Sequence, residues 1–220
     1  MQITSEKILL VEGVDDQAMF KKLIEKLEFS NIQIIIYEGK SQLKNYLNLL
    51  QKQNEFEKVT TIGITQDADN DPILALDRIN CDLKSIDLDF PKSIDDMNYF
   101  QEKNGKRVGI FLLPSLNKPG SLEDLILESI KSNLANNQLI QLIEECIEKI
   151  KNSYPSDNCT GTNGIFGVSP RESKSKCLGI FMATWKPNKS IKEAIESSYI
   201  NFDSNSWDEL KKFIKLIYDN

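Results

Sequence analysis

The sequence contains no histidine among its 220 residues. Histidine is the usual general base near neutral pH and a common metal ligand. Its absence therefore excludes Ser-His-Asp catalysis, Cys-His catalysis and histidine-ligated metal sites. Acid–base chemistry in this chain has to come from carboxylates, lysine, tyrosine or metal-bound water. This absence excludes more classes of function than any other feature of the composition.

Cysteine is also sparse, and no two cysteines form a CxxC motif. The four are Cys81, Cys146, Cys159 and Cys177. Such wide spacing argues against a zinc cage and against a disulfide framework. We expect reduced and mostly buried thiols, because a free cysteine behaves as a small hydrophobic residue.

Arginine occurs only three times, and the formal net charge of the chain is −6. Nonspecific binding of nucleic acid rests on contacts between phosphates and lysine or arginine. The overall charge therefore makes the chain a poor nonspecific nucleic-acid binder. A local basic strip or a bound metal ion could still hold a phosphodiester.

Long hydrophobic runs are absent as well. No stretch approaches the roughly 18 apolar residues of a transmembrane helix, so we expect no membrane partner. The first residues, MQITSEKILLVEG, lack a basic n-region, and the apolar run at 8–11 is too short for a signal peptide. We therefore expect a cytoplasmic protein. With 40% hydrophobic and 27% charged residues, the chain should bury an ordinary core.

Short apolar runs alternate with segments of helical periodicity over the first 113 residues. The apolar runs predict strands at 7–11, 32–37, 59–65 and 107–113. A further strand at 97–101 and the dipeptide Asn104-Gly105 predict a hairpin. The periodic segments predict helices at 16–27, 41–53, 71–86, 121–134, 138–150, 174–185, 190–198 and 207–218.

Alternation of strands and helices is typical of a mainly parallel sheet with helices on both faces. The predicted fold class is therefore α/β, with added C-terminal helices. We expect a single domain over residues 1–220. Its core should span 7–115, and a mainly helical extension at 116–220 should pack on that core.

Acidic residues follow three of the predicted strands. Glu12 follows the first strand, Asp67 and Asp69 follow the third, and Glu123 comes shortly after the strand at 107–113. Ligands of an open α/β sheet bind beyond the carboxyl ends of its strands. Converging carboxylate oxygens are the ligands that Mg²⁺ and Mn²⁺ prefer. The sequence therefore predicts a divalent-metal site at this edge of the sheet.

Helix capping is the alternative explanation for several of these acidic residues. Asp15 or Asp16 would cap the first helix, where a negative charge meets the helix N-terminus favourably. Asp71 precedes Pro72 and would cap the helix that follows it. Glu12 precedes a glycine and lies too early to cap a helix, so we expect a functional role for it.

Ser121 and Asp124 have the spacing of a capping box, although glutamate is the usual partner at the second position. A metal-binding role for Glu123 and a purely structural role of this segment therefore both stay open. Gly120 permits close approach of the backbone, which suits either role.

Two motifs, VEGVDD after the first strand and DADND after the third, together resemble the TOPRIM domain. This domain occurs in topoisomerases, bacterial primases, OLD-family nucleases, RecR proteins and ribonucleases that mature ribosomal RNA. Its pattern is a glutamate after strand one and a DxD motif after strand three, here Glu12 with Asp67 and Asp69. The resemblance covers residues 7–115.

The later residues are most similar to the OLD-like branch and to small stand-alone TOPRIM-like proteins. This resemblance implies further metal ligands at Ser121 and Glu123, and another at Asp16, four positions after the first glutamate. It also implies a catalytic lysine, at Lys174 or Lys176.

The activity implied by the resemblance is phosphoryl transfer on DNA or RNA that depends on Mg²⁺ or Mn²⁺, with Glu12 as a metal ligand or general base. The sequence contains no recognisable ATPase domain, topoisomerase tyrosine domain or primase zinc module. One alternative is action together with a separate ATPase or another protein partner. Another is a catalytically degenerate module that binds metal, nucleotide or a protein.

Overall fold

The computed structural model describes residues 2–88, 100–132, 137–153, 177, 179–180, 190–197 and 200–219. The chain forms two compact units. The first comprises Met1–Leu122 together with Trp207–Asn220, and the second comprises Glu123–Ser206. The last helix of the chain thus belongs to the same unit as the first strand.

The first unit is built on a five-stranded sheet with the strand order β2-β1-β3-β5-β4. The strands are β1 (Lys7–Val11), β2 (Ile32–Ile36), β3 (Thr61–Asp67), β4 (Phe100–Lys103) and β5 (Lys106–Leu113). Four strands run parallel, and only the edge strand β4 is antiparallel, in a hairpin with β5. The prediction of a mainly parallel α/β sheet, and of a hairpin at Asn104-Gly105, is confirmed.

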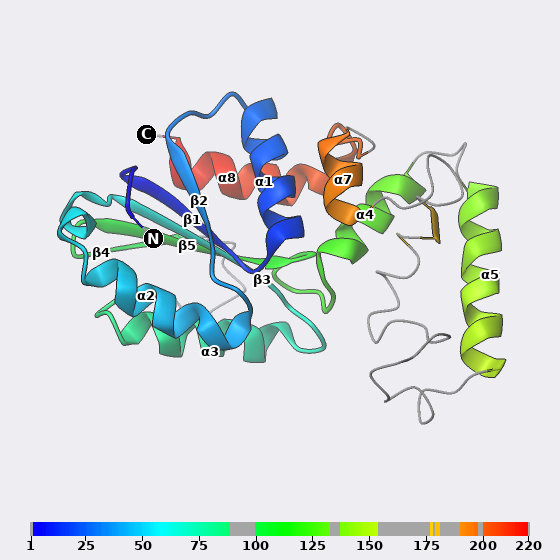
Figure 1. Ribbon diagram of the computed structural model, residues 1–220, viewed down its shortest axis with the longest axis horizontal. Helices are drawn as coiled ribbons and strands as arrows, with labels where there is room; N and C mark the ends of the chain where they lie inside the picture. Colours follow the sequence, from blue (N-terminus) through cyan, green and yellow to red (C-terminus); the bar gives the residue numbers. More distant parts are fainter. Residues whose placement is uncertain are drawn as a thin grey trace. The chain divides into compact units, whose positions relative to one another are not determined.

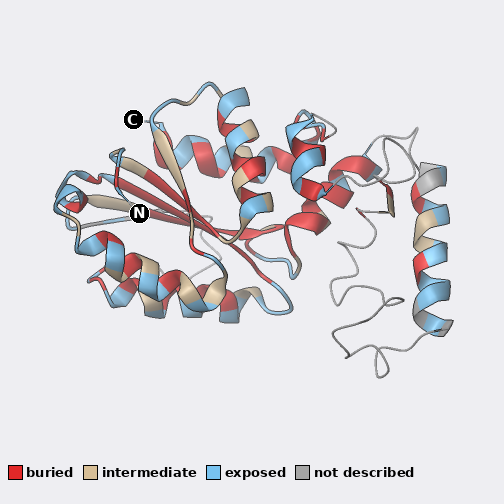
Figure 2. Cartoon of the chain, in the orientation of Figure 1, coloured by how far each residue is buried: buried red, intermediate tan, exposed pale blue. Residues whose placement is uncertain are grey.

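Helices cover both faces of this sheet, as Figure 1 shows. Helices α1 (Val14–Lys26) and α8 (Asp208–Tyr218) lie over one face, and α2 (Leu43–Gln51) and α3 (Pro72–Lys84) lie over the other. Short 3-10 helices occupy Lys40–Gln42, Asn54–Lys58 and Asn205–Trp207. Every residue of β3 is buried, including the polar residues Thr65, Gln66 and Asp67 in its C-terminal half (Figure 2).

Helix α8 packs directly on the sheet against β3 and β5. Its Tyr218 is fully buried, and the Tyr218 hydroxyl donates a hydrogen bond to the carbonyl oxygen of Ile8 at 2.8 Å. Gly63 on β3 makes room for this hydroxyl, because a Cβ atom at Gly63 would collide with it. The glycine thus permits the close approach of the C-terminal helix.

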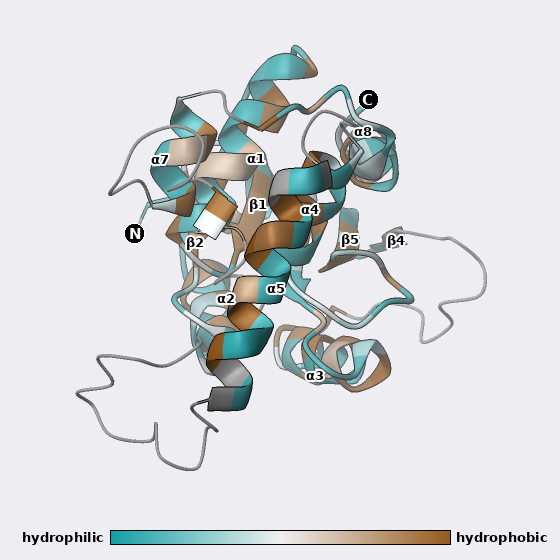
Figure 3. Ribbon diagram, turned by 90° about the vertical axis from the view of Figure 1, so that its right-hand side faces the viewer, coloured by the Kyte–Doolittle hydropathy of each residue, from teal (hydrophilic) through white to brown (hydrophobic). Residues whose placement is uncertain are grey.

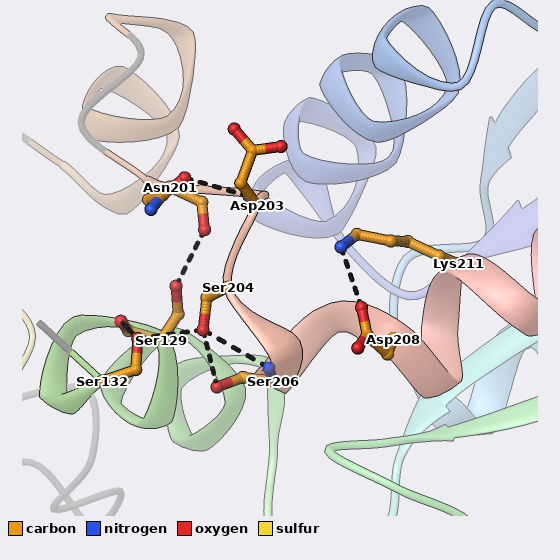
Figure 4. Close-up of polar contacts among 8 residues, drawn as sticks. All are labelled: Ser129, Ser132, Asn201, Asp203, Ser204, Ser206, Asp208 and Lys211. Atoms are coloured by element: carbon orange, nitrogen blue, oxygen red, sulfur yellow. Dashed lines mark hydrogen bonds and ion pairs between the residues drawn. The ribbon is translucent and has the colours of Figure 1, made fainter.

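The second unit is helical in its described part, with α5 (Asn137–Ser153), α7 (Ile191–Glu196) and most of α4 (Leu122–Lys131). Hydroxyl groups tie α4 to the segment that follows α7 (Figure 4). Ser129 Oγ donates to the carbonyl oxygen of Asn201 at 3.1 Å, and the hydroxyls of Ser132 and Ser204 lie 2.9 Å apart. These bonds join segments that are about 70 residues apart in the sequence.

Helix α5 is amphipathic (Figure 3). Ile140 and Ile147 are buried, whereas Leu142 and Ile150 are exposed. Within the described part of the chain, no helix combines the length and the apolar character that a membrane span requires.

Two expectations about local structure are wrong. Cys81 and Cys146 are exposed, and of the three described cysteines only Cys177 is buried. Cys81 lies on α3 and Cys146 on α5. The first helix begins at Val14 with Gly13 as its N-cap, so neither Asp15 nor Asp16 is the N-cap. The predicted helix at 174–185 lies mostly outside the described residues.

Candidate functional site

The turns that follow β1 and β3 lie next to each other, because these strands are hydrogen-bonded neighbours. Glu12 comes directly after the last residue of β1, and Asp67 is the last residue of β3. Parallel strands end at the same edge of a sheet, so both acidic residues belong to its carboxyl edge.

Asp16 joins these two residues from the first turn of α1. Asp16 is 9% exposed, and its Oδ2 accepts a hydrogen bond from the Gly13 N–H at 3.0 Å. Burial, followed by the charges of Asp67 and Glu12, raises the pKa of Asp16 from 3.8 to about 8, although the hydrogen bond from Gly13 opposes this change. The Asp16 carboxyl is therefore largely protonated at neutral pH when no metal is bound.

Asp67 is 5% exposed and contacts the start of helix α4. Its Oδ1 accepts a hydrogen bond from the Leu122 N–H at 3.0 Å. The N-terminus of a helix stabilises a negative charge, so this bond favours the ionised carboxylate. The same bond brings the Gly120-Ser121 segment to the end of β3, and Ser121 is itself buried.

Asp69 lies in a turn whose backbone is fixed from both sides. Its φ of 51° is in the left-handed region, and its N–H and carbonyl pair with Gly120 at 2.9 and 2.6 Å. The Ala68 N–H also donates to the carbonyl of Leu113 at 2.9 Å. The DxD motif is therefore held against the segment that follows β5.

Lys40 is a further residue at this edge that the sequence analysis did not consider. It follows β2, and its Nζ donates to the Asp67 carbonyl oxygen at 2.9 Å and forms an ion pair with the Asp69 carboxylate. The signal in the sequence is a glycine-lysine pair shortly after the predicted strand at 32–37.

Tyr37 and Gln66 form a buried polar pair close to the acidic residues. The Tyr37 hydroxyl donates to the Thr65 carbonyl oxygen at 3.0 Å and to Gln66 Oε1 at 3.4 Å. Burial, and then the charges of Glu12 and other nearby carboxylates, hold the pKa of Tyr37 well above its usual value. This tyrosine therefore stays protonated at neutral pH and acts as a hydrogen-bond donor.

The remaining predicted residues have different positions. Asp71 is the N-cap of α3, as expected, and its Oδ1 accepts from the Leu74 N–H at 3.0 Å. Glu123 begins the second unit and is buried there, where its carbonyl oxygen accepts a hydrogen bond from Cys177 Sγ at 3.4 Å. Lys174 and Lys176 lie outside the described residues.

Carboxylate oxygens are the right kind of ligand for Mg²⁺ or Mn²⁺. Among the described residues, however, no three acidic or cysteine side chains are already gathered in an arrangement that would hold a metal ion. Asp16, Asp67 and Asp69 are each bonded to a group of the protein itself. A carboxylate has about four acceptor sites, so a bond to the protein does not by itself prevent a carboxylate from binding an ion. Metal binding would require the carboxylates to draw together.

The fold and the site define a parallel α/β protein that carries an acidic cluster at the carboxyl edge of its sheet. The chain belongs to the family described as "Protein of unknown function (DUF3226)", whose profile matches residues 6–219. A comparison with curated proteins finds no match.

Two solved structures have a similar fold. The hypothetical protein PH0156 from Pyrococcus horikoshii OT3 is 15% identical, with a TM-score of 0.58 over 96% of this chain and 94% of its own. The C-terminal region of the Burkholderia pseudomallei OLD protein is 14% identical, with a TM-score of 0.52 over 99% of this chain and 98% of its own. At such low identity these similarities concern the fold alone.

Proposed function

We propose that the chain is a divalent-metal-dependent phosphoryl-transfer enzyme that acts on nucleic acid, with the organisation of an OLD-like TOPRIM nuclease. One observation carries the proposal. Burial, followed by the charges of Asp67 and Glu12, raises the pKa of the Asp16 carboxyl, so carboxyl groups from two adjacent strand ends and the first turn of α1 share one electrostatic environment. Acidic groups with raised pKa values gather at functional sites more often than elsewhere.

In this proposal Glu12, Asp16, Asp67 and Asp69 hold the metal ion, and Ser121 and Glu123 supply further ligands. A divalent cation would offset both the burial of the Asp16 carboxylate and its repulsion by Asp67 and Glu12, which together raise the pKa of Asp16. When bound, such an ion polarises a phosphate oxygen and generates a nucleophile from water. This chemistry suits a chain that has no histidine.

The side chains of the protein would complete the reaction. Glu12 would act as a metal ligand or accept a proton from the attacking water. Lys174 or Lys176 would neutralise the charge that develops on the phosphate, as the resemblance to TOPRIM enzymes implies. With a net charge of −6, the chain would hold its substrate mainly through the metal and local lysines.

The proposal is tested by incubating the protein with single-stranded DNA, double-stranded DNA and RNA in the presence of Mg²⁺ or Mn²⁺. We expect cleavage that EDTA abolishes. Asp67→Asn should reduce the rate by a factor of roughly 10² or more, since it removes a charged ligand while keeping the shape of the side chain.

Asp71→Asn is the matched control for this substitution. Asp71 is exposed, caps α3 and can be replaced by asparagine, which is also a good N-cap. This variant should cleave at the wild-type rate. Absence of cleavage by the wild type, or equal rates for Asp67→Asn and wild type, would contradict the catalytic proposal.

A second candidate function is a non-catalytic module that binds metal, nucleotide or a protein partner. It is favoured by the ion pair between Lys40 and Asp69, which satisfies one carboxylate of the DxD motif without any metal. A protein that binds Mn²⁺ in calorimetry, yet cleaves none of the three nucleic acids, would support this function.

A further inference from the structure

Lys40 reaches across the end of a neighbouring strand to contact the DxD motif. In the sheet, β1 lies between β2 and β3 (Figure 1). Lys40 follows β2, yet its Nζ contacts Asp67 and Asp69 at the end of β3. Its side chain therefore spans the carboxyl end of β1, where Glu12 begins the turn to α1.

The backbone before Lys40 is fixed in this position by Gly39. Gly39 has a φ of 99°, which favours glycine, and its N–H donates to the carbonyl oxygen of Glu12 at 3.2 Å. Its own carbonyl oxygen accepts from the Gln42 N–H at 2.9 Å. The turn after β2 is thereby tied to the turn after β1, and Lys40 starts from a fixed point.

The ammonium of Lys40 binds the two kinds of oxygen that a metal cation would use. One is the main-chain carbonyl of Asp67 and the other is the carboxylate of Asp69. Both oxygens belong to a turn that is held by Leu113 and Gly120, so the turn cannot easily move away from Lys40. A divalent ion that uses Asp69 as a ligand therefore meets the ammonium already in place.

Solvent has access to this ion pair. The Asp69 side chain is 46% exposed and the Lys40 side chain 19% exposed. An ion arriving from solution can therefore reach the outer side of the Asp69 carboxylate. The Lys40 side chain is long and flexible, so it can leave without a change in the backbone.

We propose that Lys40 is an internal competitor of the divalent cation at Asp69. The inference rests on the proposed function, because it concerns the cation site of that function. In the metal-free protein the ammonium neutralises Asp69, and metal binding displaces it. Lys40 thereby weakens metal binding and keeps the Asp69 carboxylate of the DxD motif neutralised until an ion is available.

The test is calorimetric titration with Mn²⁺ alone, on the full chain. Lys40→Met should lower the Kd for Mn²⁺ by about fivefold, the effect expected from removing one partly exposed ion pair. Lys40→Arg should keep the wild-type Kd, because it retains the positive charge. Lys40→Gln, also neutral, provides the same comparison if methionine impairs folding.

Lys44→Met is the matched control. Lys44 is exposed on α2. The substitution Lys44→Met changes the net charge of the chain by the same amount as Lys40→Met. The Kd of this variant should equal that of the wild type. In the Asp69→Asn background, Lys40→Met should no longer tighten binding, because the carboxylate for which the two cations compete is gone.

Several outcomes would overturn the inference. These are an unchanged or higher Kd in Lys40→Met, an equal gain in Lys44→Met, a gain that persists in the Asp69→Asn background, or no Mn²⁺ binding by any variant. A higher Kd would mean that Lys40 positions Asp69 for the ion. Cleavage is not measured in this titration, so the inference can hold for an inactive protein and can fail for an active nuclease.

Discussion

At the scale of single residues, Asp16 is a strongly perturbed carboxyl group of the site. Its pKa of about 8 in the folded protein lies above the usual value of 3.8, which applies to the unfolded chain. At any pH between these two pKa values, the folded state binds more protons at Asp16 than the unfolded state does. The contribution of Asp16 to stability is therefore fully present below about pH 4 and is lost as the pH rises towards 8.

This difference predicts how Asp16→Asn changes metal-free stability. Asparagine cannot ionise, so the variant lacks the loss of stability that the wild type shows between pH 4 and 8. As the pH rises from 4 to 8, the free energy of unfolding of Asp16→Asn minus that of the wild type should increase by up to about 1.4 kcal/mol per pH unit. Urea denaturation in EDTA at several pH values measures it. A difference that does not change with pH would show that Asp16 titrates normally in the folded protein.

The local sequence predicts some residues of this site and not others. Glu12 and Asp67 were predicted because each follows a predicted strand, whereas Asp16 was predicted as a metal ligand only through the resemblance to the TOPRIM domain. Lys40 was missed because its partners Asp67 and Asp69 are 27 and 29 residues away. No local pattern shows that a side chain will cross the end of one strand to reach the next.

At the scale of elements, apolar runs and helical periodicity predicted the strands and helices of the first unit well. The helix start at Val14 was missed by about two residues, because Gly13 takes the N-cap position and Asp16 bonds back to its N–H. The position of α8 on β3 and β5 could not be predicted, since amphipathic periodicity gives a helix an apolar face but does not say what that face covers.

The contact between α8 and β3 yields a prediction about stability. Gly63→Ala should destabilise the protein by roughly 1–3 kcal/mol, because the added methyl group collides with the Tyr218 hydroxyl and with Leu9. Tyr218→Phe alone should cost about 1 kcal/mol through the lost bond to Ile8. The double variant should cost less than the sum of the two, since it removes the hydroxyl that collides. Additive free energies of unfolding would argue against this close contact.

At the scale of the whole molecule, a metal ion that binds only the folded state should stabilise it. At a concentration 100 times its Kd, such an ion adds about 2.7 kcal/mol to the free energy of unfolding. We expect Mg²⁺ or Mn²⁺ at millimolar concentration to raise the Tm of the wild type and to have little effect on Asp67→Asn. A Tm that is the same with either ion and with EDTA would indicate that the acidic cluster binds no metal.

The first unit is discontinuous in the sequence, because Glu123–Ser206 separates its sheet from α8. During synthesis on the ribosome, β1, β3 and β5 emerge long before the helix that covers them. Until Tyr218 has left the exit tunnel, Ile8 lacks its hydroxyl donor and the α8 face of β3 and β5 stays open to water. The nascent chain therefore carries an uncovered apolar sheet surface while the second unit is still being made, and in that interval chaperones or aggregation would act on it.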